Sequence, residues 1–141
     1  MSLNDALSVS ASGLDAERVR IEVAVSNLAN AESTRGANGQ PYRRRDVVLA
    51  SDPALSFETA LNKASSVGVK VAGIVEDRSP FPRRYDPSHP DADGEGYVAM
   101  PNIDTPEEMV NMLSASRAYQ ANLAAIGLIN DTARRALEIG K

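Results

Sequence analysis

The residues best suited to chemistry form an acid-rich run at positions 86–96. This run holds the only histidine of the 141-residue chain among four carboxylates: Asp86, His89, Asp91, Asp93 and Glu95. Alternate carboxylates are typical of the start of a calcium-binding loop. The twelfth position from Asp91 is Asn102, where an EF-hand needs a bidentate glutamate, so that template fails.

Two interpretations of this run stay open. Its proline and aspartate content favours a structural turn region. The alternative is a soluble coiled-coil adaptor that binds a ligand or metal through Asp86, His89 and Asp91. Calorimetry with calcium and zinc separates the two, because tight binding by a well-ordered monomer is expected only of the adaptor. We favour the turn and expect no metal and no cofactor.

The chain lacks most of the residue types that other catalytic arrangements require. Cysteine is absent, one histidine is available, and no serine lies in a nucleophile-elbow motif. Gly94 and Gly96 precede a predicted strand, so they do not form a phosphate-binding loop in front of a helix. We therefore expect that the protein is not an enzyme.

A basic cluster, Tyr42 followed by Arg43, Arg44 and Arg45, could suggest a nucleic-acid contact. The formal net charge is −4, however, and no second basic patch exists. We expect a solvated strand whose charges serve subunit contacts, and no nucleic-acid partner.

The ends of the chain carry no signal for a membrane. Residues 1–7 have no positive charge and no apolar run follows them, so a cleaved signal peptide is not expected. No stretch approaches the roughly 18 apolar residues of a membrane span, and we expect no direct membrane insertion. Any export should use a route that does not read such a signal.

The elements that position these residues are dominated by a long helix at 105–141, where a heptad pattern runs in alternating steps of three and four. One face of such a helix docks on another helix. Thr105 is expected to cap it, Pro106 to take its first position and Glu108 to close a capping box. The predicted contact row is Met109, Met112, Ser116, Tyr119, Leu123, Ile126, Asn130, Ala133, Leu137 and Gly140.

The same rhythm predicts an N-terminal helix that begins just after Ser2 or Asn4 and fades near Ala31. Its large residues, a heptad apart, are Leu7, Leu14, Ile21 and Leu28. Polar residues interrupt both rows and other apolar residues face away from them, so each helix needs more than one neighbour. This pattern favours an assembly subunit over a self-sufficient monomer.

Polar and small residues in the N-terminal helix leave alternatives open. Gly13 is either a tolerated surface glycine or a place where a neighbouring helix comes close. Near the end of the helix, Ser26, Asn27 and Asn30 either bond loop backbone or form a solvated helix end.

The middle of the chain is irregular and holds three predicted strands, at 42–50, 67–75 and 96–100, with a short helical pattern at 53–64. Three short strands make at most a small antiparallel sheet. The expected fold is therefore mainly α, with an N-terminal helix (1–34), a small irregular and β middle region (35–104) and a C-terminal helix (105–141). The two helices should pair as an antiparallel, coiled-coil-like stem.

Two terminal motifs resemble those of the bacterial flagellar rod and hook proteins. The N-terminal motif is Ser12-Gly13-Leu14 with Asn27-Leu28-Ala29-Asn30, in which Leu28 replaces the usual isoleucine. The C-terminal motif is Glu108-Met109-Val110 with Ala115-Ser116-Arg117-Ala118-Tyr119-Gln120-Ala121-Asn122. The short middle, with Pro41 to Arg44, Gly68 to Val71, Tyr85 to Pro87 and Gly96 to Val98, is most similar to that of the proximal rod members.

This resemblance implies a structural subunit of the basal-body rod, in the periplasmic space. Such proteins are exported by the flagellar type III apparatus without signal cleavage and assemble through their terminal helices into a hollow helical drive shaft. The implied partners are other copies of the chain, proximal and distal rod proteins, the adaptor at the export gate and MS ring, and the export apparatus itself.

Assembly should then order helices that stay mobile in the monomer, because only neighbours bury their surplus apolar surface. Polar residues at seam positions should fix the register. The expected assembly interface is Leu7, Gly13, Leu14, Ile21, Asn27, Leu28, Asn30, Met109, Met112, Tyr119, Gln120, Asn122, Leu123, Ile126 and Leu137.

Overall fold

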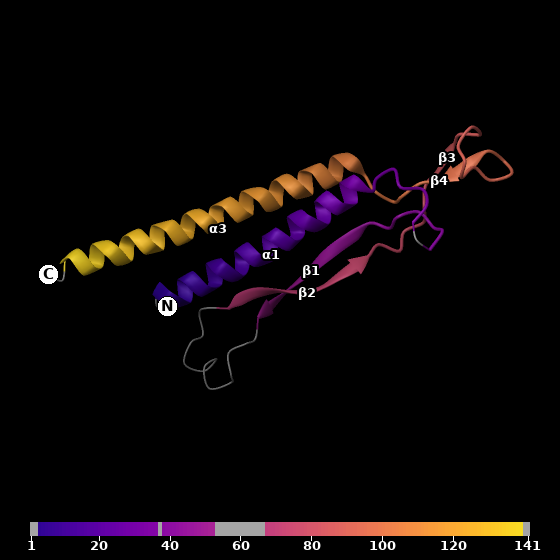
Figure 1. Cartoon of the computed structure of the whole chain (residues 1–141). Helices are drawn as coiled ribbons and strands as arrows, with labels where there is room; N and C mark the ends of the chain where they lie inside the picture. Colours follow the sequence, from indigo (N-terminus) through magenta and orange to yellow (C-terminus); the bar gives the residue numbers. More distant parts are fainter. Residues whose placement is uncertain (1–2, 37, 53–66, 140–141) are drawn as a thin grey trace.

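The computed structural model describes residues 3–36, 38–52 and 67–139, and its two long helices are joined by short antiparallel strands (Figure 1). This arrangement confirms a mainly α chain with a small β middle. The short helix expected at 53–64 and the terminal Gly140 lie outside the described residues. The elements in chain order are α1 (Leu3–Ala29), β1 (Arg45–Asp52), β2 (Gly68–Glu76), β3 (Arg83–Tyr85), β4 (Tyr97–Ala99) and α3 (Thr105–Ile139).

The two helices lie side by side and run antiparallel, with the N-terminus of α1 nearest the C-terminal half of α3 (Figure 1). A methyl group added at Gly13 would lie 2.9 Å from Nδ2 of Asn122. Such a distance is inside van der Waals contact, so the Asn122 side chain would have to move to admit a methyl group, and the glycine gives this side chain room between the helices. Of the two interpretations of Gly13, the structure supports the close approach.

Helix α1 is the middle element of the fold. It packs against α3, β1 and β2, whereas α3 contacts α1 alone among the described elements. The solvent-facing row of α1 repeats in steps of three and four, as expected for a helix that is covered on two sides. That row is Asn4, Ser8, Ala11, Asp15, Arg18, Glu22, Val25 and Ala29.

The predicted contact row of α3 consists of two lines, each of residues seven positions apart. The structure differs from the prediction in one of these lines. Met112, Tyr119, Ile126 and Ala133 are half-buried as the pattern requires. The second line, however, lies one residue earlier than predicted: Glu108, Ala115, Asn122 and Ile129 are the more buried residues. Met109 and Leu123 keep 53% and 54% of their surface exposed. The shift follows from two contacts, Gly13 with Asn122 and a buried ion pair of Glu108, that periodicity alone does not contain.

The start of α3 also differs from the prediction. Asp104, and not Thr105, caps the helix: its Oδ1 accepts the backbone N–H of Glu107 at 3.3 Å, and its carbonyl accepts that of Glu108 at 3.0 Å. The predicted capping box is therefore wrong. The Glu108 carboxylate turns away from the helix end because Arg44 and Asn27 provide stronger partners.

The strands form two separate two-stranded sheets in place of one small sheet. Strands β1 and β2 pair as a hairpin with a bulge between Val48 and Leu49, and this hairpin lies along α1 (Figure 1). Strands β3 and β4 pair at one end of the molecule. The sequence did not predict β3, because its three residues are all exposed and prolines precede it, a pattern that reads as loop.

The turn between β3 and β4 is held by Asp93. Its Oδ1 accepts the backbone N–H groups of Glu95 at 2.9 Å and of Tyr97 at 2.9 Å, and its other oxygen pairs with Arg83. The rings of Tyr85 and Tyr97 meet edge to face at 5.3 Å. This end of the molecule is therefore organised by turn hydrogen bonds, an aromatic pair and the fully buried side chain of Val98.

Candidate functional site: a buried polar junction and exposed helical rows

Asn27, in the last turn of α1, is 1% exposed and uses its whole hydrogen-bonding capacity. Its Nδ2 donates to the carbonyl of Arg45 at 2.8 Å and to Oε2 of Glu108 at 3.0 Å. Its Oδ1 accepts the N–H of Arg45 at 3.0 Å and the hydroxyl of Tyr42 at 3.2 Å. One side chain thus joins α1, the start of β1 and the first turn of α3.

Glu108 is 2% exposed and is the charged centre of this junction. Nε of Arg44 donates to its Oε1 at 2.6 Å, and Nη2 of Arg44 donates to Glu107 at 3.3 Å. The hydrogen bond from Arg44 to Glu108 is the main reason that the pKa of Arg44 lies above its ordinary value, outweighing the opposite effect of partial burial. The guanidinium and amide partners compensate the charge of the buried Glu108 carboxylate. Loss of this carboxylate would leave Arg44 without its main partner.

A second layer fixes Arg44 from the backbone side. Its N–H donates to Oδ1 of Asn102 at 2.9 Å, and its carbonyl accepts the N–H of Asp77 at 2.8 Å. Asn102 in turn donates to the carbonyl of Asp77 at 3.2 Å. The segments before β1, after β2 and before α3 are therefore tied together at one point.

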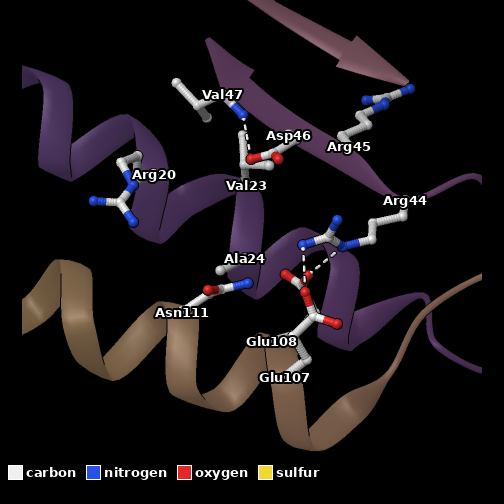
Figure 2. Close-up of a pocket in the computed structure, with 10 residues that line it drawn as sticks. All are labelled: Arg20, Val23, Ala24, Arg44, Arg45, Asp46, Val47, Glu107, Glu108 and Asn111. Atoms are coloured by element: carbon white, nitrogen blue, oxygen red, sulfur yellow. Dashed lines mark hydrogen bonds and ion pairs between the residues drawn. The ribbon is translucent and has the colours of Figure 1, made fainter. Parts of the chain in front are cut away.

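A cleft of about 310 Å³ lies beside the junction, between α1, β1 and the start of α3 (Figure 2). Its charged groups balance: three arginines face three carboxylates. Arg44 points at Glu107 and Glu108, Arg20 is held by Glu17 at 2.9 Å, and Arg45 lies 3.7 Å from Glu76. These ion pairs stabilise the junction, and the carboxylate of Asp46 accepts the backbone N–H of Val47 at 2.8 Å. The lining residues are Arg20, Val23, Ala24, Arg44, Arg45, Asp46, Val47, Glu107, Glu108 and Asn111.

The basic cluster at 43–45 is engaged within the chain. The guanidinium of Arg43 lies 4.2 Å above the ring of Phe81 and donates to the carbonyl groups of Asp77 and Ser79. Together with the Arg44 and Arg45 contacts, this gives each of the three arginines a partner within the chain. The sequence did not predict this use, because the ion-pair partners of Arg44 and Arg45 and the Phe81 ring are remote along the chain. The local exception is Tyr42, whose ring lies 5.5 Å from the Arg45 guanidinium.

The candidate metal ligands do not converge. Asp91 pairs with Arg35 and accepts the hydroxyl of Thr34 at 2.8 Å, and Nδ1 of His89 accepts the N–H of Asp91 at 3.1 Å. Asp86 accepts the hydroxyl of Ser88 at 2.7 Å, which lowers its pKa. Across residues 3–36, 38–52 and 67–139, no three histidine, aspartate or glutamate side chains group as ligands. The adaptor alternative is not favoured.

The residues predicted for the assembly interface fall into three groups. Asn27 is buried in the junction. A second group is half-buried: Leu7, Gly13, Leu14, Ile21, Leu28, Asn30, Met112, Tyr119, Asn122 and Ile126. A third group is exposed on α3: Met109, Gln120, Leu123 and Leu137.

Of the two alternatives for the end of α1, bonding to backbone outside the helix is supported at Asn27, whereas Asn30 bonds back to the helix itself and to the side chain of Ser33. Asn30 donates to the carbonyl of Ser26 at 2.9 Å and accepts the hydroxyl of Ser33 at 3.2 Å, while Asn27 bonds backbone at Arg45. The sequence predicts a cap role for Glu108 and a place in a basic cluster for Arg44, but it does not predict that these two residues and Asn102 meet in one junction. The available signal was weak: an arginine beside an aromatic residue and a glutamate in a first turn have many uses.

Neither helix, over its described residues, has an apolar stretch that is long enough to cross a membrane.

Comparison with known proteins gives one family. A model described as "Flagella basal body rod protein" matches residues 7–37, and one described as "Flagellar basal body rod FlgEFG protein C-terminal" matches residues 95–139. The flagellar basal-body rod protein FlgC of Bacillus subtilis is 46% identical over 151 residues, and that of Salmonella typhimurium 42% over 141, each covering 100% of both chains. The FlgC of Borreliella burgdorferi is 40% identical over 149 residues, covering 99% of this chain and 98% of its own. The chain therefore belongs to the FlgC family of flagellar basal-body rod proteins.

Proposed function

We propose that this chain is a structural subunit of the proximal rod of the bacterial flagellar basal body. The observation that carries the proposal is identity of 40% or more to FlgC proteins over essentially the whole chain. The charge-balanced junction supports it, because its groups serve to hold three segments together. A catalytic role is not part of the proposal.

The subunit is exported by the flagellar type III apparatus without signal cleavage and works in the rod, in the periplasmic space. Its partners are other copies of the chain, proximal and distal rod proteins, and the adaptor at the export gate and MS ring. The absence of cysteine suits a chain that passes between redox compartments.

Assembly proceeds through the terminal helices, which form a coiled-coil-like antiparallel stem (1–34 with 105–141) beside a middle region (35–104). The exposed part of the predicted row supports assembly through the helices, because it gives α3 apolar surface that α1 does not cover. These residues are Met109, Leu123 and Leu137. In the assembled rod a neighbouring helix covers these side chains.

The test is Leu123→Asp. Because Leu123 is 54% exposed in the monomer, the purified variant should keep its helix content by circular dichroism and lose less than about 0.5 kcal/mol of stability. Its incorporation into isolated basal bodies should be abolished, since a carboxylate would be buried without a partner. Leu123→Met is the matched control and should assemble normally. A large loss of helix in the monomer would instead place the row inside an independently folded helical hairpin and contradict the proposal.

A further inference from the structure

Among the described residues, no helix lies beside the C-terminal end of α3. Gly13 faces Asn122, and Asn27 faces Glu108. In both pairs the residue numbers have the same sum, so the register is constant along the antiparallel helices. By the same register Leu3, the first described residue of α1, faces Thr132. Figure 1 shows α3 continuing past the described start of α1. At about 1.5 Å per residue, positions 133–139 extend about 10 Å beyond it.

This overhang carries both apolar and charged groups that lack a partner. Leu137 is 74% exposed, the highest value among the large apolar residues described, and it lies two heptads after Leu123 on the same row. Arg134 and Arg135 are exposed and make no ion pair within the described part of the chain. With Glu138, which is also exposed, positions 133–139 hold two cations and one anion, so the overhang keeps a net positive charge. Such a helix end is complementary to an apolar surface flanked by a carboxylate.

The opposite end of the helical pair presents such a surface on the side away from β1. Val23 and Asn111 line the cleft beneath β1. Leu28 lies five residues after Val23, about 140° around α1, and Met109 lies two residues before Asn111, about 200° around α3. Both therefore face the side that the hairpin leaves open, where Leu28 is half-buried and Met109 is 53% exposed.

The carboxylate at this end is Glu32, one turn of chain after Leu28. It is exposed and, among the described residues, has no cationic partner. Glu32 and the overhang arginines are therefore unpaired charges of opposite sign at opposite ends of one molecule, each beside exposed apolar surface.

We propose that the overhanging end of α3 in one copy docks on this open side of a second copy, with Leu137 against Leu28 and Met109. Glu32 of the second copy then pairs with Arg134 or Arg135 of the first. The two surfaces are different, so the contact is heterologous and repeats head to tail without closing on itself as a dimer. The inference rests on the proposed function and adds which two surfaces of the subunit meet.

The chain contains no cysteine, so single-cysteine variants report contacts without background. Leu137→Cys and a size-tagged Met109→Cys variant are produced together in cells that lack their own FlgC, and basal bodies are isolated and mildly oxidised. The mixed disulfide should exceed by severalfold the dimer formed by either variant alone. Val25→Cys, on the solvent-facing row of α1, replaces Met109→Cys as the matched control and should give background only.

Charge reversal sharpens the test. Glu32→Arg on the Met109→Cys chain should lower the mixed yield severalfold, and Arg134→Glu with Arg135→Glu on the Leu137→Cys chain should restore it. Basal bodies that contain both cysteine variants but only background mixed disulfide overturn the inference and leave the proposed function standing. Predominant Leu137→Cys homodimers also overturn it, since they require a symmetric contact.

The proposed function fails separately, if the unaltered chain does not enter basal bodies. In that case, oxidation of the two purified variants mixed at rising concentration decides the inference. A mixed disulfide above the Val25→Cys background supports the head-to-tail contact, and background alone overturns it.

Discussion

The two ends of the helical pair are built differently. At the junction end, one asparagine, one glutamate and one arginine tie α1, β1 and α3 together. Every buried side-chain polar atom there has a hydrogen-bond partner, as is the case throughout the described residues. At the far end, the described part of α1 before Ala16 and of α3 after Ala115 contains no fully buried residue. Large apolar side chains such as Leu123, Leu128 and Leu137 remain exposed there. One end fixes the register of the helices, and the other keeps apolar surface available for neighbours.

This difference separates two tasks that one apolar seam could not perform alone. Apolar contacts are non-directional, so they tolerate sliding between helices. A buried polar network tolerates none, because a shifted register leaves donors and acceptors unpaired. The network at one end sets the alignment of the pair, together with the contact of Gly13 and Asn122 nearer the other end, where large apolar side chains remain exposed.

The largest expected effect is at Glu108. Glu108→Ala leaves Arg44 and the Asn27 amide without their buried partner and should lower the free energy of unfolding by about 3 kcal/mol. Urea denaturation followed by circular dichroism measures the loss. Glu107→Ala, one residue earlier with a side chain 60% exposed, is the matched control and should cost less than about 1 kcal/mol. Equal losses would mean that the junction has no special role.

Asn27 should come next. Asn27→Ala removes four hydrogen bonds, and the Arg45 backbone and the Glu108 carboxylate lose a buried partner, at a cost of about 2 kcal/mol. Asn30→Ala, in the same region but half-buried, should cost roughly half as much. Hydrogen exchange should show faster exchange at the start of α3, 81 residues away in sequence. Protection that stays unchanged there would contradict the coupling.

Gly13 tests how closely the helices approach. Gly13→Ala should destabilise the protein by about 1 kcal/mol, because the new methyl group meets the Asn122 amide. In an Asn122→Ala background the same change should stabilise by about 1 kcal/mol, the ordinary preference of a helix for alanine. Gly127→Ala, where no atom lies within 4 Å of the added methyl group, should stabilise in either background. Thermal denaturation of the four variants is sufficient, and an unchanged sign at Gly13 would contradict the contact.

The smallest effect is expected with acid at the β3–β4 end. Hydrogen bonds from the Tyr97 and Glu95 backbone lower the pKa of Asp93, and that from Ser79 lowers the pKa of Asp77. A lowered folded-state pKa contributes stability above the unfolded value near 3.9 that is lost as pH falls through the folded value. The NMR signals of Tyr85 and Tyr97 should therefore shift below about pH 4, while helix content stays constant. Asp93→Asn should remove most of this shift, and a shift of equal size in that variant would exclude Asp93 as its source.

Much of the fold followed from local pattern. Two terminal helices and an irregular middle with strands were predictable, because helical periodicity and the absence of proline are properties of neighbouring residues. The close approach at Gly13 was one of two alternatives, and the structure decided between them. The strand β3 was missed, since three exposed residues after prolines carry no strand signal.

The sequence by itself determined where the helices lie and the family. Only the tertiary structure decided which row of α3 faces α1 and what Glu108 does. A one-residue shift turns a helix by about 100°, and the contacts that select it join residues 64 or more positions apart, such as Arg44 with Glu108. No local pattern contains that pairing, because it exists only when α1, β1 and α3 have come together.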